Sequence, residues 1–409
     1  MIEVSKPKSI LRSQLQITGS KSESNRLLLL NQLFHQALTL ENISNSEDSD
    51  LMQKALANTS DVIDIHHAGT AMRFLTAYLS IQDGRTVTLT GSTRMKQRPI
   101  GVLVEALNQL GADIRYVENE GYPPLLITGK NIQKDQITIP ANVSSQYITA
   151  LMLIGTQLEK GLTITLEGKI ISVPYIQMTL QLLNRIGVKA EMNGQHIHVE
   201  PKKEIQPQII QVESDWSSAS YYYSLVALSP NSEISISTYY PDSLQGDSAL
   251  QKIYQEHFGV ESTFKNGTLT LKNDPNFNFD EVISLDLNNT PDIAQTIAAT
   301  CVGLKLNCHL TGLETLKIKE TDRLQALKNE LEKVGAEIEI TADSLTIKGY
   351  HIIEEIPVFE TYNDHRMAMC MAPLAVKFPI QIKNEMVVEK SYPTFWEDWK
   401  HLGFEIKIQ

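Results

Sequence analysis

Cysteine is scarce in this chain. Cys301, Cys308 and Cys370 are the only three among 409 residues, and their spacing matches no metal-binding pattern. An odd number of cysteines without such spacing argues against a disulfide framework or a zinc centre, and it favours unpaired thiols in a reducing compartment. We therefore expect a cytoplasmic protein that holds no metal.

Long apolar runs and excess positive charge are also missing. The longest apolar run, 367–376, is far shorter than the ~20 residues that a membrane-spanning helix needs, and the first residues, MIEVSKPKS, lack the apolar core of a signal peptide. Lys and Arg number 36 against 48 Asp and Glu, which gives a net charge of −12. A nucleic-acid-binding protein would normally present a basic face. We expect neither nucleic acid nor membrane as a partner, although local clusters of cations can still bind small anions.

The motifs of common cofactors and nucleophiles are absent as well. The stretch TGSKSESNR, residues 18–26, lacks the spacing of a Walker phosphate loop, and no dinucleotide fingerprint or G-x-S-x-G element occurs. Of the two short histidine groups, at 66–67 and 196–198, the second is better explained by strand alternation than by a ligand set. We expect no cofactor.

One pattern does recur: an amphipathic helical stretch, a glycine, and then a short alternating strand. The glycines are separated by 76, 72, 76 and 68 residues, and they are Gly111, Gly187, Gly259, Gly335 and Gly403. Glycine suits the left-handed C-terminal cap of a helix that turns directly into a strand. Five such sites at a near-constant period predict a repeated α/β unit.

The end of the repeat indicates how the chain closes. Each copy but the last is followed by a second strand, with short turns such as Asn193-Gly194 and Asn266-Gly267. The last copy ends at Gln409, and MIEVSK at the N-terminus has the character of its missing strand. We predict that the two terminal strands pair. Five clear copies and a degenerate one then divide into a discontinuous domain, 1–20 with 214–409, and a second domain, 21–213.

Small and cationic residues gather at expected helix starts. The stretches are GSKSESNR, HHAGTAMRF, STRMKQRPIG, VSSQYITALML and DWSSASYYYSL, and Pro99 in the third has the position of a first helical residue. Free backbone amides at a helix start bind anions, and Lys21 and Arg98 add charge. A capped helix explains each stretch taken alone. Their recurrence predicts one cleft that holds phosphates and carboxylates.

The titratable groups lie in the C-terminal half. They are Asp292 in NNTPDIAQT, Lys319, Glu320 and Arg323 in KETDR, Asp364, His365 and Arg366 in NDHRMAM, and Lys390. Carboxylates among cations stay ionised near neutrality and are available for proton transfer. For His365, a core histidine with a backbone partner is an equally good interpretation.

Together these motifs resemble the 5-enolpyruvylshikimate-3-phosphate synthases (3-phosphoshikimate 1-carboxyvinyltransferases), a family of enolpyruvyl transferases. The stretches that carry the resemblance run in the family's order along nearly the whole chain: GSKSESNRLLLL, AGTAMRF, GSTRMKQRPIG, VSSQYITALM, ISVPYIQMTL, DWSSASYYYSL, PDIAQT, IKETDRLQAL, TYNDHRMAM and EKSYPTF. The resemblance implies an α/β fold of two similar domains. Each would hold three βαβαββ units in an inverse, barrel-like arrangement, with the ligand cleft between the domains.

The same resemblance implies the reaction. The enolpyruvyl group of phosphoenolpyruvate would move to the 5-hydroxyl of shikimate 3-phosphate through a tetrahedral intermediate, with release of phosphate. This is a step of the shikimate pathway toward chorismate and the aromatic amino acids, and it needs no metal or organic cofactor. Glyphosate is expected to compete with phosphoenolpyruvate. The expected partners are the two substrates alone, and the chain is expected to be a monomer.

The resemblance also assigns roles to residues. Lys21, Asp292 and Glu320 would be catalytic, Asp292 taking the hydroxyl proton and Glu320 protonating the methylene carbon. The residues expected to hold shikimate 3-phosphate are Lys21, Ser22, Arg26, Ser144, Ser145, Gln146, Ser172, Tyr175, Asp292, Thr315 and Lys319. Those expected to hold phosphoenolpyruvate are Lys21, Gly69, Arg98, Gln146, Arg323, Arg366 and Lys390.

Four positions depart from the family's usual pattern. His67, Phe74, Val173 and Thr315 stand where the family usually has Asn, Pro, Lys and Asn, and we expect them to affect affinity and glyphosate sensitivity rather than the reaction. Two alternatives remain. The sibling transferase that acts on UDP-N-acetylglucosamine carries a loop cysteine that STRMKQRPIG lacks, and a non-catalytic anion-binding repeat protein would not need Asp292 and Glu320.

Overall fold

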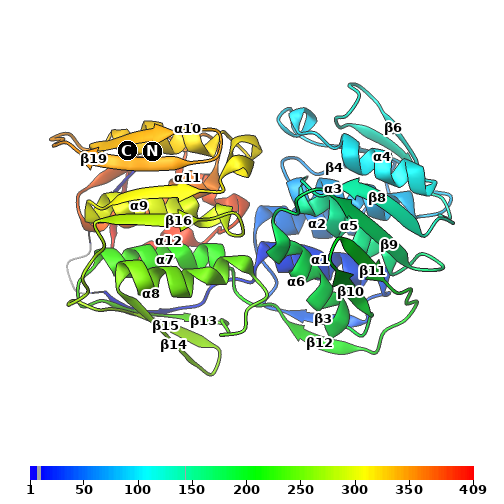
Figure 1. Ribbon diagram of the computed structural model, residues 1–409, viewed down its shortest axis with the longest axis horizontal. Helices are drawn as coiled ribbons and strands as arrows, with labels where there is room; N and C mark the ends of the chain where they lie inside the picture. The colour runs from blue at the N-terminus through cyan, green and yellow to red at the C-terminus, as the bar shows by residue number, and fades with distance from the viewer. Residues whose placement is uncertain (7–10, 143) are drawn as a thin grey trace. The chain divides into compact units, whose positions relative to one another are not determined.

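The computed structural model describes residues 1–6, 11–142 and 144–409, and the chain divides into two compact units (Figure 1). The terminal unit consists of Met1–Thr18 and Glu213–Gln409, and the inserted unit is Gly19–Val212. The division expected from the sequence lies one residue away at one crossing and two residues away at the other.

Most sheets share one topology. In the described part of the chain five sheets have four strands, in which the first and second strands are parallel, the fourth lies antiparallel to the second, and the third pairs at the outside of the fourth. Helices follow the first and second strands. This is the predicted βαβαββ unit, so the mixed α/β fold is confirmed. Each of these sheets stays separate, and within the described residues none closes into a barrel.

The inserted unit holds two full copies and one short copy. The first full copy is β4 (Val62–Asp64), α3 (Gly69–Ser80), β5 (Thr86–Thr90), α4 (Gly101–Leu110), β6 (Asp113–Tyr116) and β7 (Leu125–Thr128). The second is β8 (Gln136–Pro140), α5 (Ser145–Gly155), β9 (Leu162–Glu167), α6 (Val173–Arg185), β10 (Ala190–Asn193) and β11 (His196–Val199). The short copy is α1 (Lys21–Leu33), β3 (Leu38–Glu41), α2 (Glu47–Ala57) and β12 (Gln208–Gln211), where β12 and β3 form a two-stranded parallel sheet. The predicted degenerate copy near the N-terminus is confirmed.

The terminal unit holds three full copies. The first is β2 (Arg12–Leu15), α7 (Trp216–Leu228), β13 (Glu233–Ser237), α8 (Leu250–Phe258), β14 (Val260–Lys265) and β15 (Thr268–Asn273). The second is β16 (Val282–Asp286), α9 (Ala294–Leu304), β17 (Asn307–Thr311), α10 (Arg323–Glu332), β18 (Ala336–Ile340) and β19 (Leu345–Tyr350). The third is β20 (Val358–Phe359), α11 (His365–Met371), β21 (Ile380–Ile382), α12 (Phe395–His401), β22 (Glu405–Ile408) and β1 (Ile2–Ser5). Short 3₁₀ helices lie at η1 (Met95–Gln97), η2 (Gly246–Ala249), η3 (Pro291–Ile293), η4 (Glu314–Ile318), η5 (Ala372–Val376) and η6 (Glu385–Lys390).

The repeated glycines occupy the positions that the sequence predicts. Gly111, Gly187, Gly259, Gly335 and Gly403 follow a helix and have φ angles between 64° and 117°. A side chain is disfavoured in this left-handed region, which explains why each copy uses glycine to turn from helix to strand. The hairpin turn between β14 and β15 has the same basis, since Asn266 and Gly267 have φ angles of 51° and 74°.

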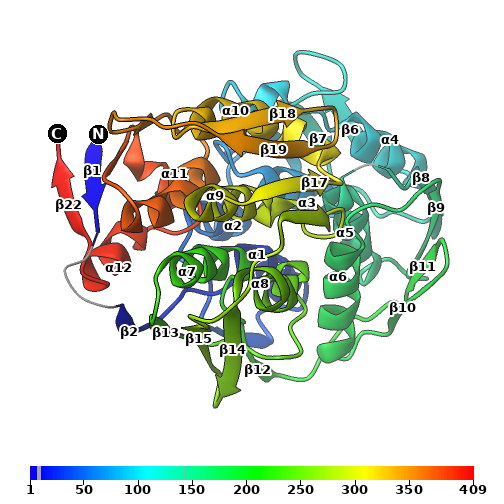
Figure 2. The ribbon, with the colours of Figure 1, turned by 60° about the vertical axis from the view of Figure 1, so that its left-hand side comes forward.

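The two ends of the chain lie in one sheet. β1 pairs antiparallel with β22, Ile2 opposite Ile408 (Figure 2). On its other edge β1 pairs with β21. The predicted pairing of the terminal strands is therefore confirmed. β1 is an inner strand of this sheet, so the N-terminal residues complete the last copy of the repeat.

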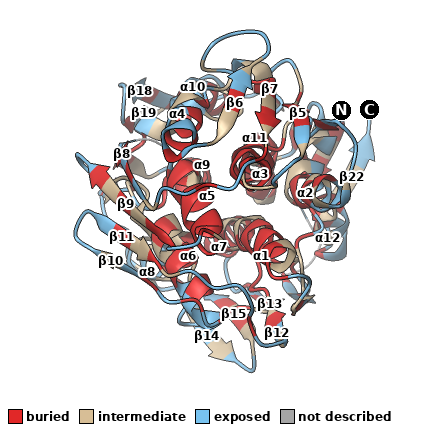
Figure 3. Ribbon diagram, turned by 90° about the vertical axis from the view of Figure 1, so that its right-hand side faces the viewer, coloured by how far each residue is buried: buried red, intermediate tan, exposed pale blue. Residues whose placement is uncertain are grey.

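Helices form the interior of each unit and sheets its outside. In the inserted unit α3 packs against α5 and α1, and every residue of α3 is buried (Figure 3). In the terminal unit α7 packs against α9, and α9 against α11 and α10. A helix that is buried all round needs neighbours on every side, and this packing brings the helix starts of different copies close together. None of the helices in the described part of the chain is long and apolar enough to span a membrane.

Candidate active site

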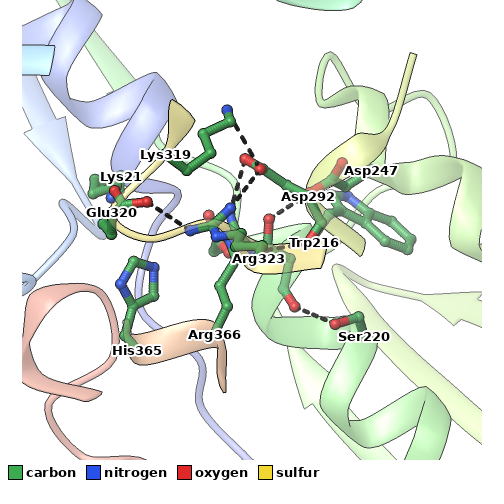
Figure 4. Close-up of polar contacts among 12 residues, drawn as sticks. Lys21, Trp216, Ser220, Asp247, Asp292, Lys319, Glu320, Arg323, His365 and Arg366 are labelled. Carbon is green, nitrogen blue, oxygen red and sulfur yellow. Dashed lines mark hydrogen bonds and ion pairs between the residues drawn. The ribbon is translucent and has the colours of Figure 1, made fainter. Parts of the chain in front are cut away.

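Charged residues meet at three helix starts of the terminal unit. Asp292 lies in η3 just before α9, Lys319 and Glu320 precede Arg323 at the start of α10, and Arg366 is the second residue of α11 (Figure 4). α9, α10 and α11 pack against one another. We call Asp292, Lys319, Glu320, Arg323 and Arg366 the carboxylate–cation cluster. The structure brings these predicted site residues of the terminal unit together.

Arg323 is the centre of this cluster. Its guanidinium is 2% exposed and donates to three carboxylates: Nη1 to Asp292 Oδ1 at 2.9 Å, Nη2 to Glu320 Oε2 at 2.8 Å, and Nε to Asp364 Oδ2 at 2.6 Å. Burial by itself would lower the pKa of this guanidinium, but Asp364, Glu320 and Asp292 together raise it above its usual value. Arg323 therefore stays a cation, and its planar fork fixes the positions of Glu320 and Asp292.

Asp292 lies among three cations. Its carboxylate is 3.5 Å from Lys319 Nζ and 2.9 Å from Arg323 Nη1, and it accepts from Arg366 Nη2 at 3.2 Å. Burial alone would raise the pKa of the Asp292 carboxyl, but Arg366, Lys319 and Arg323 hold it well below its usual range. Asp292 is thus a carboxylate at neutral pH, and a weak base for as long as all three cations face it.

Asp364 was named in the sequence analysis among the titratable groups but given no role in the site, and Asp247 was not named there. Asp364 caps α11 by accepting from the Arg366 amide at 2.9 Å. Its fully buried carboxylate also accepts from Arg323 Nε. Its signal in the sequence was a cap residue directly before an apolar helix, which is common to many helices. Asp247, in η2, is buried and accepts a hydrogen bond from the Ser217 hydroxyl. Nothing in its sequence context points to the cluster.

Asp247 makes the stability of the terminal unit depend on pH. Burial, with Asp292 nearby, raises the pKa of its carboxyl to about 6. An acid whose pKa is raised on folding binds its proton more tightly in the folded state, so stability falls as pH rises from about 4 to about 6. Asp247→Asn cannot ionise and can still accept from Ser217. We expect this variant to be more stable than the parent above pH 6, by up to about 3 kcal/mol, and to gain nothing below pH 4.

Tryptophan fluorescence measures this directly, because Trp216, Trp396 and Trp399, the only three tryptophans, all belong to the terminal unit. Urea midpoints at pH 4 and pH 8 give the comparison. An equal gain at both pH values would mean that a neutral packing change, and not ionisation of Asp247, causes the stabilisation.

Three further residues that the sequence analysis named lie around the carboxylate–cation cluster. Lys390, at the end of η6, donates to the carbonyl of Asn363 at 2.7 Å, directly before Asp364. The Thr315 hydroxyl in η4 is buried, and within the described residues it makes no hydrogen bond. His365 is almost fully buried, with Nδ1 at 3.9 Å from Asp364 Oδ1. Its burial is that of a core histidine, which was one of its two interpretations.

In the inserted unit the predicted residues also gather at helix starts. Lys21 and Ser22 begin α1 after the Ser20 cap, Ser145 and Gln146 begin α5 after the Ser144 cap, and Ser172 precedes α6 with a left-handed φ of 54°. α1 packs against both α5 and α6. Gln146 Nε2 donates to Thr70 Oγ1 at 3.2 Å and so links α5 to α3.

Arg26 fixes these helix starts to one another. It is 2% exposed and donates to the Ser22 carbonyl at 2.7 Å, to the hydroxyls of Thr179 and Thr149 at 2.9 and 3.3 Å, and to the Tyr175 carbonyl at 3.4 Å. Burial lowers the pKa of its guanidinium to about 10, so it remains a cation at neutral pH. Since its donors are largely used inside the unit, a direct contact of Arg26 with a ligand stays a prediction.

Gly69 and Arg98 are in close contact. A Cβ placed on Gly69, the first residue of α3, would lie 2.6 Å from Arg98 Nη1. Arg73, one turn along α3, is buried and donates to the carbonyls of Gly69 and Pro99. The prediction that Pro99 begins a helix is wrong: α4 begins at Gly101, and the Pro99 carbonyl instead accepts from Arg73 and from the Tyr147 hydroxyl.

The sequence of the chain is similar to proteins of known name. A sequence model of the family described as EPSP synthase (3-phosphoshikimate 1-carboxyvinyltransferase) matches residues 53–399. A 3-phosphoshikimate 1-carboxyvinyltransferase from Bacteroides fragilis is 44% identical over 407 residues, which cover 98% of this chain and 97% of that protein. One from Colwellia psychrerythraea is 33% identical and covers 95% of this chain and 96% of its own length.

Solved structures have the same fold. An EPSP synthase from Acinetobacter baumannii superposes with a TM-score of 0.79 at 20% identity and covers all of both chains. The enolpyruvyl transferase NikO from Streptomyces tendae gives a TM-score of 0.75 at 13% identity, with 99% of this chain and 98% of that chain covered.

Proposed function

The chain belongs to the EPSP synthase (3-phosphoshikimate 1-carboxyvinyltransferase) family, and on this premise we propose that it transfers the enolpyruvyl group of phosphoenolpyruvate to the 5-hydroxyl of shikimate 3-phosphate and releases phosphate. The observation that carries the proposal is the Asp292 carboxylate among Lys319, Arg323 and Arg366, with Glu320 on the same guanidinium. Such a cluster can bind anionic substrates and move protons in one place. We place this reaction in the cytoplasm, and we propose that the chain acts as a monomer.

The first chemical step is an addition. The 5-hydroxyl oxygen bonds to C2 of phosphoenolpyruvate, its proton passes to Asp292, and Glu320 gives a proton to C3. The C2–O bond to phosphate then breaks, the leaving phosphate takes the proton held by Asp292, and a proton of the C3 methyl group returns to Glu320, which restores the double bond and both carboxyl groups. Lys21 and the arginines balance the charge of the phosphates and the carboxylate throughout.

The cations around Asp292 make its basicity depend on the substrates. With Lys319, Arg323 and Arg366 all facing it, the Asp292 carboxylate holds a proton poorly. Substrate anions compete for Lys319 and Arg366, and each cation drawn toward a phosphate or carboxylate oxygen makes Asp292 a better base. Substrate binding would thus prepare the base for the addition.

The proposal requires residues of both units to contact the same substrates. We propose that the units are two domains, and that the terminal unit supplies the carboxylate–cation cluster and Lys390 while the inserted unit supplies Lys21, Gly69, Arg98, Gln146 and the serines. Bound dianions would then hold the two domains together. We expect small-angle scattering to show a smaller radius of gyration with shikimate 3-phosphate and glyphosate than without them. An unchanged radius at saturating ligand would argue against this shared site.

A phosphate-release assay tests the activity. Purified protein given phosphoenolpyruvate and shikimate 3-phosphate, without added metal, should release phosphate, and glyphosate should inhibit it in competition with phosphoenolpyruvate. A parallel reaction with UDP-N-acetylglucosamine should release none. Release only in that second reaction would assign the chain to the sibling activity, and no release in either would contradict the proposal.

Gly69→Ala should weaken phosphoenolpyruvate binding through Arg98. The added Cβ, 2.6 Å from Nη1, must displace the flexible guanidinium and not the backbone, so the fold should survive. Loss of one charge-assisted contact corresponds to a rise in the KM for phosphoenolpyruvate of roughly tenfold. In a double-mutant cycle, Gly69→Ala added to Arg98→Ala should raise KM no further. Additive effects would mean that Gly69 acts independently of Arg98.

A further inference from the structure

A chain of charges connects His67 to Lys21 in the inserted unit. His67 Nε2 lies 3.4 Å from Asp48 Oδ1, and Asp48 Oδ2 lies 3.1 Å from Lys21 Nζ. The three residues come from different segments: the loop before α3, the first turn of α2, and the first residue of α1. These helices pack on one another, so the contacts follow from the packing of the unit.

These three side chains are buried enough for their charges to interact. The side chain of Asp48 is 9% exposed, that of Lys21 19% and that of His67 25%. Glu47, at 46%, also faces the ring, with Oε2 at 3.5 Å from Nε2. Charged groups also lie on either side of His67 in this loop: the Arg98 guanidinium is close to Gly69, and Asp64 Oδ1 accepts from the His66 amide.

Asp48 can neutralise either of its two neighbours. When the imidazole of His67 is neutral, it does not compete with Lys21 for the charge of Asp48. When the imidazole carries a proton, Asp48 is shared between two cations, and the positive potential at Lys21 rises. Histidine is the side chain that makes this change between pH 5 and 8.

We propose that His67 is a positioning residue that controls, through Asp48, how much of the positive charge of Lys21 is available to a bound phosphate. This rests on the proposed function, in which Lys21 contacts both substrates. As a consequence, the affinity for the substrate depends on the protonation of His67 as well as on that of the substrate. The site binds anions more tightly below the titration midpoint of His67 and less tightly above it.

The test compares the parent with His67→Asn, which keeps a hydrogen-bonding side chain of similar size but cannot ionise. KM for shikimate 3-phosphate is measured for both from pH 5.5 to 8.5. The substrate phosphates also titrate in this range, but the ratio of the two KM values cancels their ionisation. We expect the variant's KM to exceed the parent's roughly three- to tenfold at the acid end, as expected for one charge at a few ångströms in a partly exposed site, and to equal it at the alkaline end.

Two further variants locate the effect. In an Asp48→Asn background, His67→Asn should change KM less than twofold at every pH, because the bridge to Lys21 is gone. In a Glu47→Gln background the pH-dependent ratio should persist, because the proposal places Asp48, and not Glu47, between His67 and Lys21. A ratio that differs from one but does not change with pH would mean that His67 only supports the loop, and would overturn the proposal.

A measurement without turnover separates this proposal from the proposed function. The imidazole of His67 is followed by NMR, and its titration midpoint should fall in Asp48→Asn and rise in Lys21→Met. Binding of inorganic phosphate, followed by calorimetry, should weaken from pH 6 to 8 more in the parent than in His67→Asn. If these coupled shifts occur without turnover of the two substrates, the proposed function is wrong and the charge chain is right. Turnover with uncoupled midpoints gives the opposite conclusion.

Discussion

Replacing Glu320 by glutamine is expected to lower kcat by roughly 10²–10⁴-fold, the range typical of a lost general acid–base group. Glutamine has the size of glutamate, and its carbonyl oxygen can still accept from Arg323 Nη2, which now lies 2.8 Å from Glu320 Oε2. The amide cannot give a proton to C3 or take it back. The loss should therefore fall on kcat, with substrate affinity largely kept.

Steady-state kinetics and calorimetric binding of shikimate 3-phosphate together check this result. Glu314→Gln is the matched control, because Glu314 is an exposed glutamate in the neighbouring η4 helix and is not part of the proposed site; its kcat should equal that of the parent. If Glu320→Gln turns over within a few-fold of the parent, Glu320 is not the proton donor. If it loses substrate binding instead, its part is to hold Arg323.

Removing Asp364 is expected to destabilise the terminal unit strongly. Asp364 is fully buried, and it holds the buried Arg323 through two contacts, Nε–Oδ2 at 2.6 Å and Nη2–Oδ1 at 3.3 Å. Breaking one partner of a buried pair typically costs 3–5 kcal/mol, because the remaining charge stays desolvated. Arg323 keeps Asp292 and Glu320, so we expect Asp364→Ala to lose about 3 kcal/mol of unfolding free energy, the lower end of that range.

Asp364 is also a helix cap, and the control must remove a cap alone. Asp322→Ala does so, since Asp322 caps α10 by accepting from the Gln325 amide at 3.1 Å. Its loss should cost about 1 kcal/mol. Asp364→Asn should lie between the two, because an asparagine oxygen can still accept from the Arg366 amide. Urea unfolding followed by tryptophan fluorescence reports on this unit, and equal losses in Asp364→Ala and Asp322→Ala would show that the ion pair contributes nothing.

Much of the fold could be predicted from the sequence because its signals are local. Glycine is favoured where a helix turns left-handed into a strand, and this preference depends on a few residues of backbone and not on the rest of the molecule. The five glycines therefore carry the repeat in their spacing, and the missing last strand points to MIEVSK. The Pro99 prediction failed for a related reason: proline is acceptable at a helix start but also just before one, and a neighbouring arginine and tyrosine use its carbonyl here.

The candidate site could be predicted only in part. Residues that belong to continuous motifs, such as Lys319, Glu320 and Arg323, were found because their order along the chain resembles the family's. Asp247 and Asp48 were missed. The ion pair of Asp364 with the buried Arg323 was missed as well. An aspartate in the first turn of a helix or at its cap is usual in any protein, so its type and position say nothing about which distant cation it will meet.

The sequence by itself determined the repeated unit, its turns, the pairing of the two ends of the chain and the identity of most charged residues at the helix starts. Only the tertiary structure decided which charges face each other: Arg323 with Asp364, 41 residues apart, Asp292 with Arg366, 74 residues apart, and Lys21 with Asp48. The physical reason is that backbone preferences act over a few residues, whereas electrostatic contacts depend on distance and burial in space. Both are set here by the packing of apolar helices from different copies of the repeat.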